Sequence, residues 1–282
     1  MNEPKRLHTS KPRTITKESP KIRYILVGLV VTYVGILILL PIVALVVGAF
    51  QEGIGGVISS LNQSDVLQSF RLTLYISLII VIVHVIFGTL TAWVLVRHKF
   101  AGRNFINGLI DLPFAVSPVV VGYMLLLLFG RNGIFAPVLE TLGVKVVFAV
   151  PGMILATLFV TLPFMIRELI PVLENLGIDQ EQAAATMGAN GWQIFWKVTF
   201  PALRWGLVYG IMLTFARALG EFGAILVVGG GIQGRTETAT LYIYRALDER
   251  QYTSAYSAAL VLGLISFLLV IGTDMARKRQ QK

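Results

Sequence analysis

The sequence predicts an all-α membrane protein with six transmembrane helices, and three observations support this prediction. Of the 282 residues, 55% are hydrophobic and only 14% are charged, whereas a typical soluble domain has about 25% charged residues. The apolar residues fall in long blocks, and a spanning helix needs about 20 such residues. The basic residues gather between alternate blocks, as they do in cytoplasmic loops.

Six apolar blocks qualify as spans. They cover residues 24–49, 70–96, 108–129, 147–166, 203–229 and 255–274. The third block contains Pro113 and Pro118, and the fourth contains Pro151 and Pro163. Proline inside a span is tolerated where neighbouring helices or water satisfy the freed carbonyl groups. We therefore expect kinked spans that pack in one bundle.

The distribution of lysine and arginine predicts that both termini are cytoplasmic. Residues 1–23 form a basic tail, expected to be unstructured, before the first span, whereas residues 50–69 contain no lysine or arginine. The segment 97–103 and the tail after residue 274 are basic again, and basic residues in 230–253 are balanced by acidic ones. The net charge of +9 thus reflects topology, with anionic lipid rather than nucleic acid as its partner. The first block is too long for a signal peptide and is expected to stay as the first transmembrane helix.

Several absences narrow the function. The chain has no cysteine, so it has no disulfide, thiol nucleophile or thiolate metal site. It has no Gly-x-x-x-x-Gly-Lys-Ser/Thr loop, so it is not expected to bind ATP by itself. Its three histidines form no cluster with carboxylates that would suggest a metal. We therefore expect no cofactor in this chain and no enzymatic activity.

A polar insert at residues 177–202 separates the fourth and fifth apolar blocks. Asp179 is predicted to cap a short helix, with Gln182 completing a capping box. Ala183 and Ala184 favour the helix, and Gly188 suits its end. A structured insert that faces water indicates a partner protein.

A second short helix is expected after a turn at Asn190-Gly191. Its aromatic residues at helical spacing are Trp192, Phe195 and Trp196. They share one face of the helix. We expect Trp192 to contact a protein, whereas Trp196 suits either a protein contact or the lipid interface. Pro201 is expected to start the next span.

The insert resembles the cytoplasmic loop of ATP-binding-cassette importer permeases. That loop reads Glu-Ala-Ala, three residues, Gly, nine residues, then Ile-x-Leu-Pro. The corresponding residues here are Gln182-Ala183-Ala184, Gly188 and Val198-Thr199-Phe200-Pro201. Gln182 lacks the usual charge, and Glu181 points about 100° away on a helix, so it is a poor substitute. We therefore expect no salt bridge to an ATPase at position 182, whereas docking of the loop to the ATPase is still expected.

The resemblance extends over residues 60–275 and is strongest to the W-type sulfate/thiosulfate permease subunits. The stretches that carry it are Leu112–Val120, Phe164–Val172 and Arg217–Ala224. Molybdate permeases are similar around Leu219–Gly223, so that stretch does not separate the two families. Ser117-Pro118 and Gly191-Trp192-Gln193 favour the W type.

The resemblance implies a type I ABC importer transmembrane domain at 60–275 with its coupling loop at 177–202. It implies a multi-pass protein of the inner cell membrane that pairs with a related second permease, two ATPase subunits and an external substrate-binding protein. ATP and Mg would bind to the ATPases, and small residues such as Ala184 and Gly188 would let an ATPase approach closely. A molybdate, tungstate or other oxyanion importer is an alternative, and an ion-gradient-driven secondary transporter is a remote one.

Arg217 and Glu221 are opposite charges one helical turn apart inside the fifth block. Each charge costs roughly 2.5–3.5 kcal/mol at membrane depth, and such residues usually face a bundle interior or water. Arg217 could attract an anion along the pathway while Glu221 orients it. Alternatively, the pair could be a structural lock, and the residues slightly favour the lock.

Three further features have structural interpretations. His84 is expected to be a hydrogen-bonded packing residue rather than a proton relay. Asp111 is expected at a helix cap or at the membrane interface. Gly206 and Gly210 form a small-xxx-small pair that suits close helix contact in lipid.

Overall fold

The computed structural model describes residues 20–280. The chain divides into two compact units, the first ending at Leu45 and the second beginning at Val46. The described residues form helices and loops without a strand, which confirms the predicted all-α class. Most of the predicted basic tail, residues 1–19, lies outside the described residues.

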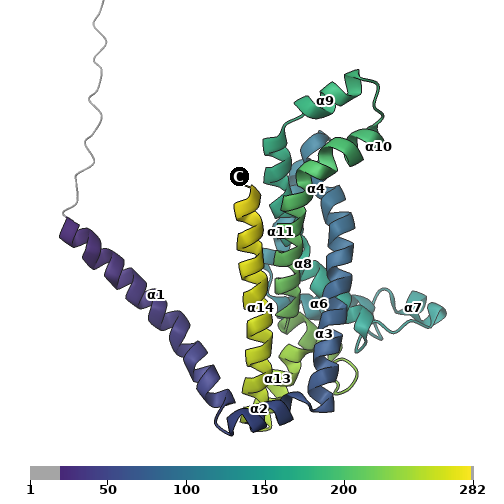
Figure 1. Ribbon diagram of the computed structural model, residues 1–282. Coiled ribbons are helices and arrows are strands. Elements are labelled where there is room, and N and C mark those ends of the chain that lie inside the picture. Colours follow the sequence, from purple (N-terminus) through teal and green to yellow (C-terminus); the bar gives the residue numbers. More distant parts are fainter. Residues whose placement is uncertain (1–19, 281–282) are drawn as a thin grey trace, which may run out of the picture. The chain divides into compact units, whose positions relative to one another are not determined.

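Figure 1 shows the helices, coloured along the sequence. In chain order they are α1 (Pro20–Ala49), α2 (Gly53–Leu61), α3 (Ser64–Val83), the π-helix η1 (His84–Gly88), α4 (Thr89–Arg97), α5 (Arg103–Ala115), α6 (Pro118–Phe129), α7 (Ala136–Leu142), α8 (Val150–Leu176), α9 (Asp179–Thr186), α10 (Gly191–Ile194), the π-helix η2 (Phe195–Thr199), α11 (Phe200–Leu219), α12 (Gly223–Gly229), α13 (Ala239–Asp248) and α14 (Tyr252–Gln280).

Five helical stretches in the described residues are long and apolar enough to cross a membrane. They are Lys21–Ala49, Ser64–Arg97, Val150–Leu176, Gly191–Leu219 and Tyr252–Gly272. The pair α5 and α6 passes the same test when its two helices are taken together, which brings the number to six. The count agrees with the predicted six spans, although several boundaries differ.

The third predicted span is not a kinked helix but a broken one. α5 and α6 are bent by 111° relative to each other. The break lies at Val116 and Ser117, both of which have extended backbones. Pro118 explains the break, because proline disfavours a helical conformation in the residue before it. Pro113 lies inside α5 and does not end it.

The fourth and fifth predicted spans have shifted ends. α8 continues to Leu176, so Arg167 lies in a helix rather than in a loop. The fifth span begins at Gly191 and ends at Leu219, where the chain leaves the helix before α12 starts at Gly223. Pro201 therefore lies inside a continuous helical stretch and does not start the span. It is tolerated there because proline is compatible with the first turn of a helix, and Pro201 lies in the first turn of α11.

Two segments that lie between the predicted spans contain helices. Residues 50–69 hold α2 and the first turn of α3, and residues 230–253 hold α13. Both helices lie at the same end of the bundle, opposite α9 and α10 (Figure 1). The glycines and polar residues of these segments do not predict a helix. The helices pack through small or β-branched side chains such as Val57 and Ala246.

α8 lies at the centre of the core. It contributes buried residues to three clusters, through Leu169 against α4 and α11, Met153 against α3 and α11, and Val160 against α6 and α12. His84, buried at the start of η1, lies 2.9 Å from Thr161 Oγ1 through its Nε2 atom. This hydrogen bond to α8 confirms the predicted packing role of His84.

The glycine pair of α11 faces α8. A β-carbon at Gly206 would lie 3.0 Å from Cγ2 of Val172, and one at Gly210 would lie 2.6 Å from Sδ of Met165. The missing side chains therefore allow the two helices to approach closely. The predicted role of this small-xxx-small pair is confirmed.

Replacing Gly210 with leucine should destabilise the bundle, because overfilling a packed interior costs about 1–3 kcal/mol. The matched control is Gly263→Leu in α14, where an added β-carbon has no atom within 4 Å. In detergent, the midpoint of thermal unfolding should fall for Gly210→Leu and stay near that of the parent for Gly263→Leu. Equal midpoints for the two variants would contradict the close approach of α8 and α11.

Candidate coupling site

The polar insert forms α9 at one end of the bundle (Figure 1). The predicted cap at Asp179 is wrong: Asp179 is the first helical residue, and Ile178 precedes it without a side-chain cap. Asp179 and Glu181 instead place two carboxylates in the first turn, where they interact favourably with the helix dipole. α9 ends at Thr186, and Gly188 follows it as predicted, with a φ of +86° in the left-handed region that favours glycine.

The capping box occurs later in the chain. The backbone N–H of Gln193 donates to Asn190 Oδ1 over 2.9 Å, and the backbone N–H of Asn190 donates to Gln193 Oε1 over 3.0 Å. This cap starts α10, which continues through η2 into α11 as one helical stretch. The predicted second short helix is thus the exposed beginning of the fifth span.

An ion pair fixes α9 to the end of α4. The guanidinium of Arg97, the last residue of α4, lies 2.9 Å from Glu181 Oε2 through Nε and donates to Oε1 over 3.1 Å through Nη2. The two side chains are only 8% and 15% exposed. Thr199 of η2 also donates to Glu181 Oε1, over 2.8 Å. One carboxylate therefore joins α9 to both α4 and the start of the fifth span.

Arg97 also satisfies the end of α8. It donates to the carbonyl oxygens of Leu173 and Gly177 over 3.2 and 2.7 Å. The last carbonyls of a helix have no partner within the helix and favour a nearby cation. We name Arg97, Glu181 and Thr199, with these carbonyls, the Arg97 node.

Sequence reasoning did not identify the Arg97 node. Arg97 and Glu181 are 84 residues apart, so only the fold reveals their contact. The available signal was a single arginine at the end of an apolar block together with a carboxylate next to the Gln182-Ala183-Ala184 motif. The expectation that Glu181 points away from position 182 is confirmed, because Glu181 turns inward while Gln182 is exposed.

The outward side of the coupling loop is apolar and exposed. Met187 is 85% exposed and Trp192 is 71% exposed, and Ile178 and Trp196 are about half exposed. The Trp192 ring lies edge-on to that of Trp196, with 5.6 Å between the centroids. An exposed apolar surface of this kind is typical of a protein or membrane contact site.

The predicted loop residues divide by their exposure. Ala184 is buried, whereas Gln182, Ala183 and Gly188 are exposed. The buried alanine lets α9 lie close to the end of the bundle. The exposed residues form part of the outward surface.

A second ion pair joins α5 to α8. Arg167 donates to both carboxylate oxygens of Asp111 over 2.6 Å, and it also contacts the side chain and carbonyl of Asn107. Such two-point pairing fixes geometry as well as energy. Asp111 is therefore a partner in an ion pair inside α5, so its expected capping role is wrong, whereas its expected place at the membrane interface stays a prediction.

Arg217 and Glu221 form an ion pair across the end of α11. Their Nη2 and Oε2 atoms lie 2.8 Å apart. Contrary to expectation, Glu221 does not share a helix with Arg217, because α11 ends at Leu219. Its Oε1 accepts from the backbone N–H of Ala224 at the start of α12, and its carbonyl accepts from Thr240 Oγ1. The Glu221 side chain is only 1% exposed, and its carboxylate accepts a hydrogen bond from a backbone N–H that the break between the two helices leaves without a helical partner.

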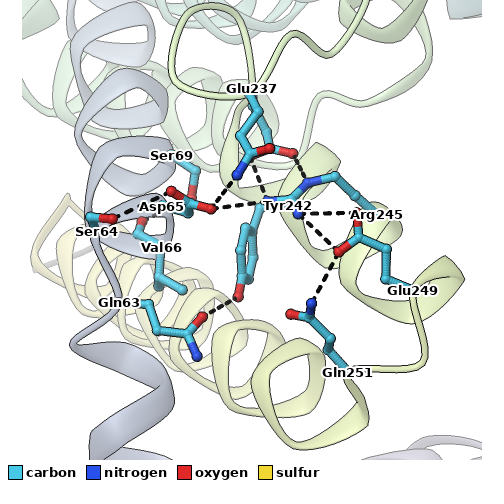
Figure 2. Close-up of polar contacts among 11 residues, drawn as sticks. Gln63, Ser64, Asp65, Val66, Ser69, Glu237, Tyr242, Arg245, Glu249 and Gln251 are labelled. Carbon is cyan, nitrogen blue, oxygen red and sulfur yellow. Dashed lines mark hydrogen bonds and ion pairs between the residues drawn. The ribbon is translucent and has the colours of Figure 1, made fainter.

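At the opposite end of the bundle, Arg245 of α13 holds three carboxylates (Figure 2). It contacts Glu237, Glu249 and Asp65 at 2.6, 3.0 and 3.6 Å. Hydrogen bonding to Glu237 raises the pKa of Arg245, and burial raises the pKa of Tyr242. Both groups keep their ordinary protonation at neutral pH, so the cluster fixes α13 to the start of α3.

Comparisons with known proteins agree with this architecture. Residues 84–282 match the profile of the family described as "binding-protein-dependent transport system inner membrane component". The chain is 47% identical to the sulfate transport system permease protein CysW of Synechococcus elongatus, over 87% of this chain and 86% of the relative. It is 36% identical to the sulfate transport system permease protein CysT of Escherichia coli K12, over 89% and 91% of the two chains.

A solved structure shows the same fold. It is a bacterial alginate ABC transporter in complex with an alginate pentasaccharide-bound periplasmic protein. Its matching chain superposes with a TM-score of 0.76 at 18% identity, covering 93% of this chain and 97% of that one.

Replacing Arg97 with glutamine should loosen α9. Removing one partner of a buried ion pair costs about 3–5 kcal/mol, so hydrogen exchange of the α9 amides should rise by roughly 150-fold or more, measured by mass spectrometry. Arg103→Gln, at the start of α5, is the control and should leave α9 unchanged. Unaltered exchange in Arg97→Gln would show that α9 is held by other contacts.

Proposed function

The chain belongs to the family of binding-protein-dependent transport system inner membrane components, and we propose that it is the W-type permease subunit of an ATP-driven sulfate or thiosulfate importer. One observation carries the choice of cargo: the 47% identity to a CysW protein across most of both chains. The lower identity of 36% to a CysT protein favours the W type. We assign the permease domain to residues 60–275.

The existence of two kinds of related permease supports a heterodimer. We propose that a T-type permease is the second subunit, that two ATPase subunits bind ATP and Mg, and that an external binding protein delivers the anion. The alginate transporter described in complex with a periplasmic protein supports the last of these partners. In this arrangement α9 and both termini are cytoplasmic, and α13 faces outward.

We propose that the ATPase holds the outward surface of the coupling loop. Gln182, Ala183, Met187 and Trp192 are exposed there, and a protruding aromatic or methionine side chain suits a partner's apolar groove. Movement of α9 would then pass through the Arg97 node to α4, α8 and the fifth span. The node makes this transmission direct, because a single carboxylate contacts two of these elements.

For Arg217 and Glu221, the geometry favours a structural lock over an anion-contacting role. Glu221 is buried and caps α12, and its partner Arg217 is itself only 28% exposed. The pair therefore holds the break between α11 and α12 in one conformation. Arg217 still has an exposed portion, so the pathway role is the alternative that an experiment must separate.

Uptake by vesicles containing the complete complex tests the cargo. Labelled sulfate should accumulate when ATP is supplied on the side of the membrane that carries the ATPases, and collapse of ion gradients should have no direct effect. Excess unlabelled thiosulfate should compete, whereas molybdate should not. Transport of molybdate but not sulfate would overturn the cargo, and gradient-driven uptake without ATP would overturn the importer class.

The Arg217→Gln variant tests the lock. Loss of a buried ionic partner costs about 3–5 kcal/mol, so the yield of assembled complex and its melting temperature should both fall. Arg217→Lys, which keeps the charge, should restore part of each. A complex that assembles and hydrolyses ATP normally but no longer transports sulfate would instead support contact with the anion.

A further inference from the structure

A cavity of about 360 Å³ lies between the last turn of α4, the first turns of α5 and the C-terminal part of α8; we call it the Arg103 cavity. Its walls contain three apolar residues and five polar or charged ones, which are Arg103, Asn104, Asn107, Arg167 and Glu174. Val96 on its wall directly precedes Arg97, and Glu174 directly follows Leu173. The cavity therefore lies beside the Arg97 node, at the end of the bundle that carries α9.

Arg103 brings to this cavity a positive charge that no carboxylate neutralises. Its side chain is half-buried at the start of α5. Within the described part of the chain, its guanidinium has no hydrogen bond or ion pair. The second arginine on the wall, Arg167, is already paired with Asp111. Glu174 is the acidic residue on the wall, and its exposed side chain forms no ion pair with Arg103.

The side chains on the wall offer an excess of hydrogen-bond donors. Arg167 has five N–H groups, and it uses four of them on Asp111 and Asn107. Because Oδ1 of Asn107 accepts from Arg167, the amide nitrogen of Asn107 is left as a donor. Asn104 adds a second amide group to the wall. Together with the guanidinium of Arg103, these groups suit a ligand that mainly accepts hydrogen bonds.

The ion pair between Arg167 and Asp111 holds part of this donor set in place. Both carboxylate oxygens accept from the guanidinium over 2.6 Å, and Asn107 is held by the same guanidinium. A donor set that is already ordered loses less conformational freedom when a ligand binds. Arginine forms strong, charge-assisted hydrogen bonds to anionic oxygens. A small oxyanion, with several acceptor oxygens and a negative charge, matches these donors, whereas a cation or an apolar molecule does not.

We infer that the Arg103 cavity binds a small tetrahedral oxyanion of the sulfate class. The identity of the anion rests on the proposed function, under which sulfate leaves the importer at the end of the bundle that carries α9. The excess of donors does not depend on that function. Glu174 opposes the negative charge of the anion and so limits its affinity.

Binding of labelled sulfate to the full chain in phosphatidylcholine nanodiscs tests this site, with chloride added to keep the ionic strength constant. Arg103→Gln should raise the Kd for sulfate about tenfold or more, the change expected when a charge-assisted hydrogen bond is lost. Glu174→Gln should lower the Kd several-fold, because it removes a like charge. A misfolded variant would not bind more tightly, so this second result does not depend on the stability of Arg103→Gln.

Arg204→Gln is the matched control. Arg204 is exposed near the start of α11 and does not line the Arg103 cavity, so this variant has the same change in net charge as Arg103→Gln. Its Kd for sulfate should equal that of the parent. Absence of sulfate binding, or equal Kd values for the parent and Arg103→Gln, would overturn the inference.

The phosphate of a lipid headgroup presents similar oxygens, so the titration is repeated in nanodiscs that contain phosphatidylglycerol. A Kd that is unchanged, or that rises equally in the parent and in Arg103→Gln, supports a site for the free anion. A Kd that rises in the parent alone would overturn it, because lipid would then compete for the cavity.

Sulfate uptake by the complete complex is measured separately. Uptake together with equal Kd values for the parent and Arg103→Gln would reject the site and leave the importer function intact. Absence of uptake together with binding that depends on Arg103 would instead reject the proposed function and leave the anion site intact.

Discussion

The ion pair between Arg97 and Glu181 determines where the coupling helix lies. α9 buries a single residue, Ala184, so apolar packing cannot hold it. Burying two charges is costly unless further hydrogen bonds satisfy them. Two carbonyls of the α8 end and Thr199 supply those bonds. Four elements therefore share one polar centre, and α9 cannot move without disturbing all of them.

A second constraint concerns the two short helices α6 and α12. α6 and α12 each follow a break, and they pack against each other: a β-carbon at Gly122 of α6 would lie 2.6 Å from Cβ of Val227. Broken helices at membrane depth need partners for their freed backbone groups. Glu221 provides one for α12.

The sequence predicted the helical class, the number of spans and the helical structure of the polar insert, because apolar block length, helix propensity and turn signals are local properties. It did not predict the break at Ser117 as a sharp bend, since Pro113 and Pro118 look alike in sequence although only Pro118 ends a helix. The partners of Arg97 and Asp111 depend on tertiary contacts over 84 and 56 residues. No local pattern reveals such pairs.

The same geometry explains how glutamine can occupy position 182. Glu181 turns inward, where it pairs with Arg97 and accepts a hydrogen bond from Thr199, while the side chain at position 182 is exposed. The two adjacent positions thus have different surroundings, because Glu181 is paired within the chain and Gln182 is exposed. An amide at 182 loses the charge but can still hydrogen-bond. Met187 and Trp192 are exposed in the same insert, so the proposed docking to an ATPase would not depend on that single charge.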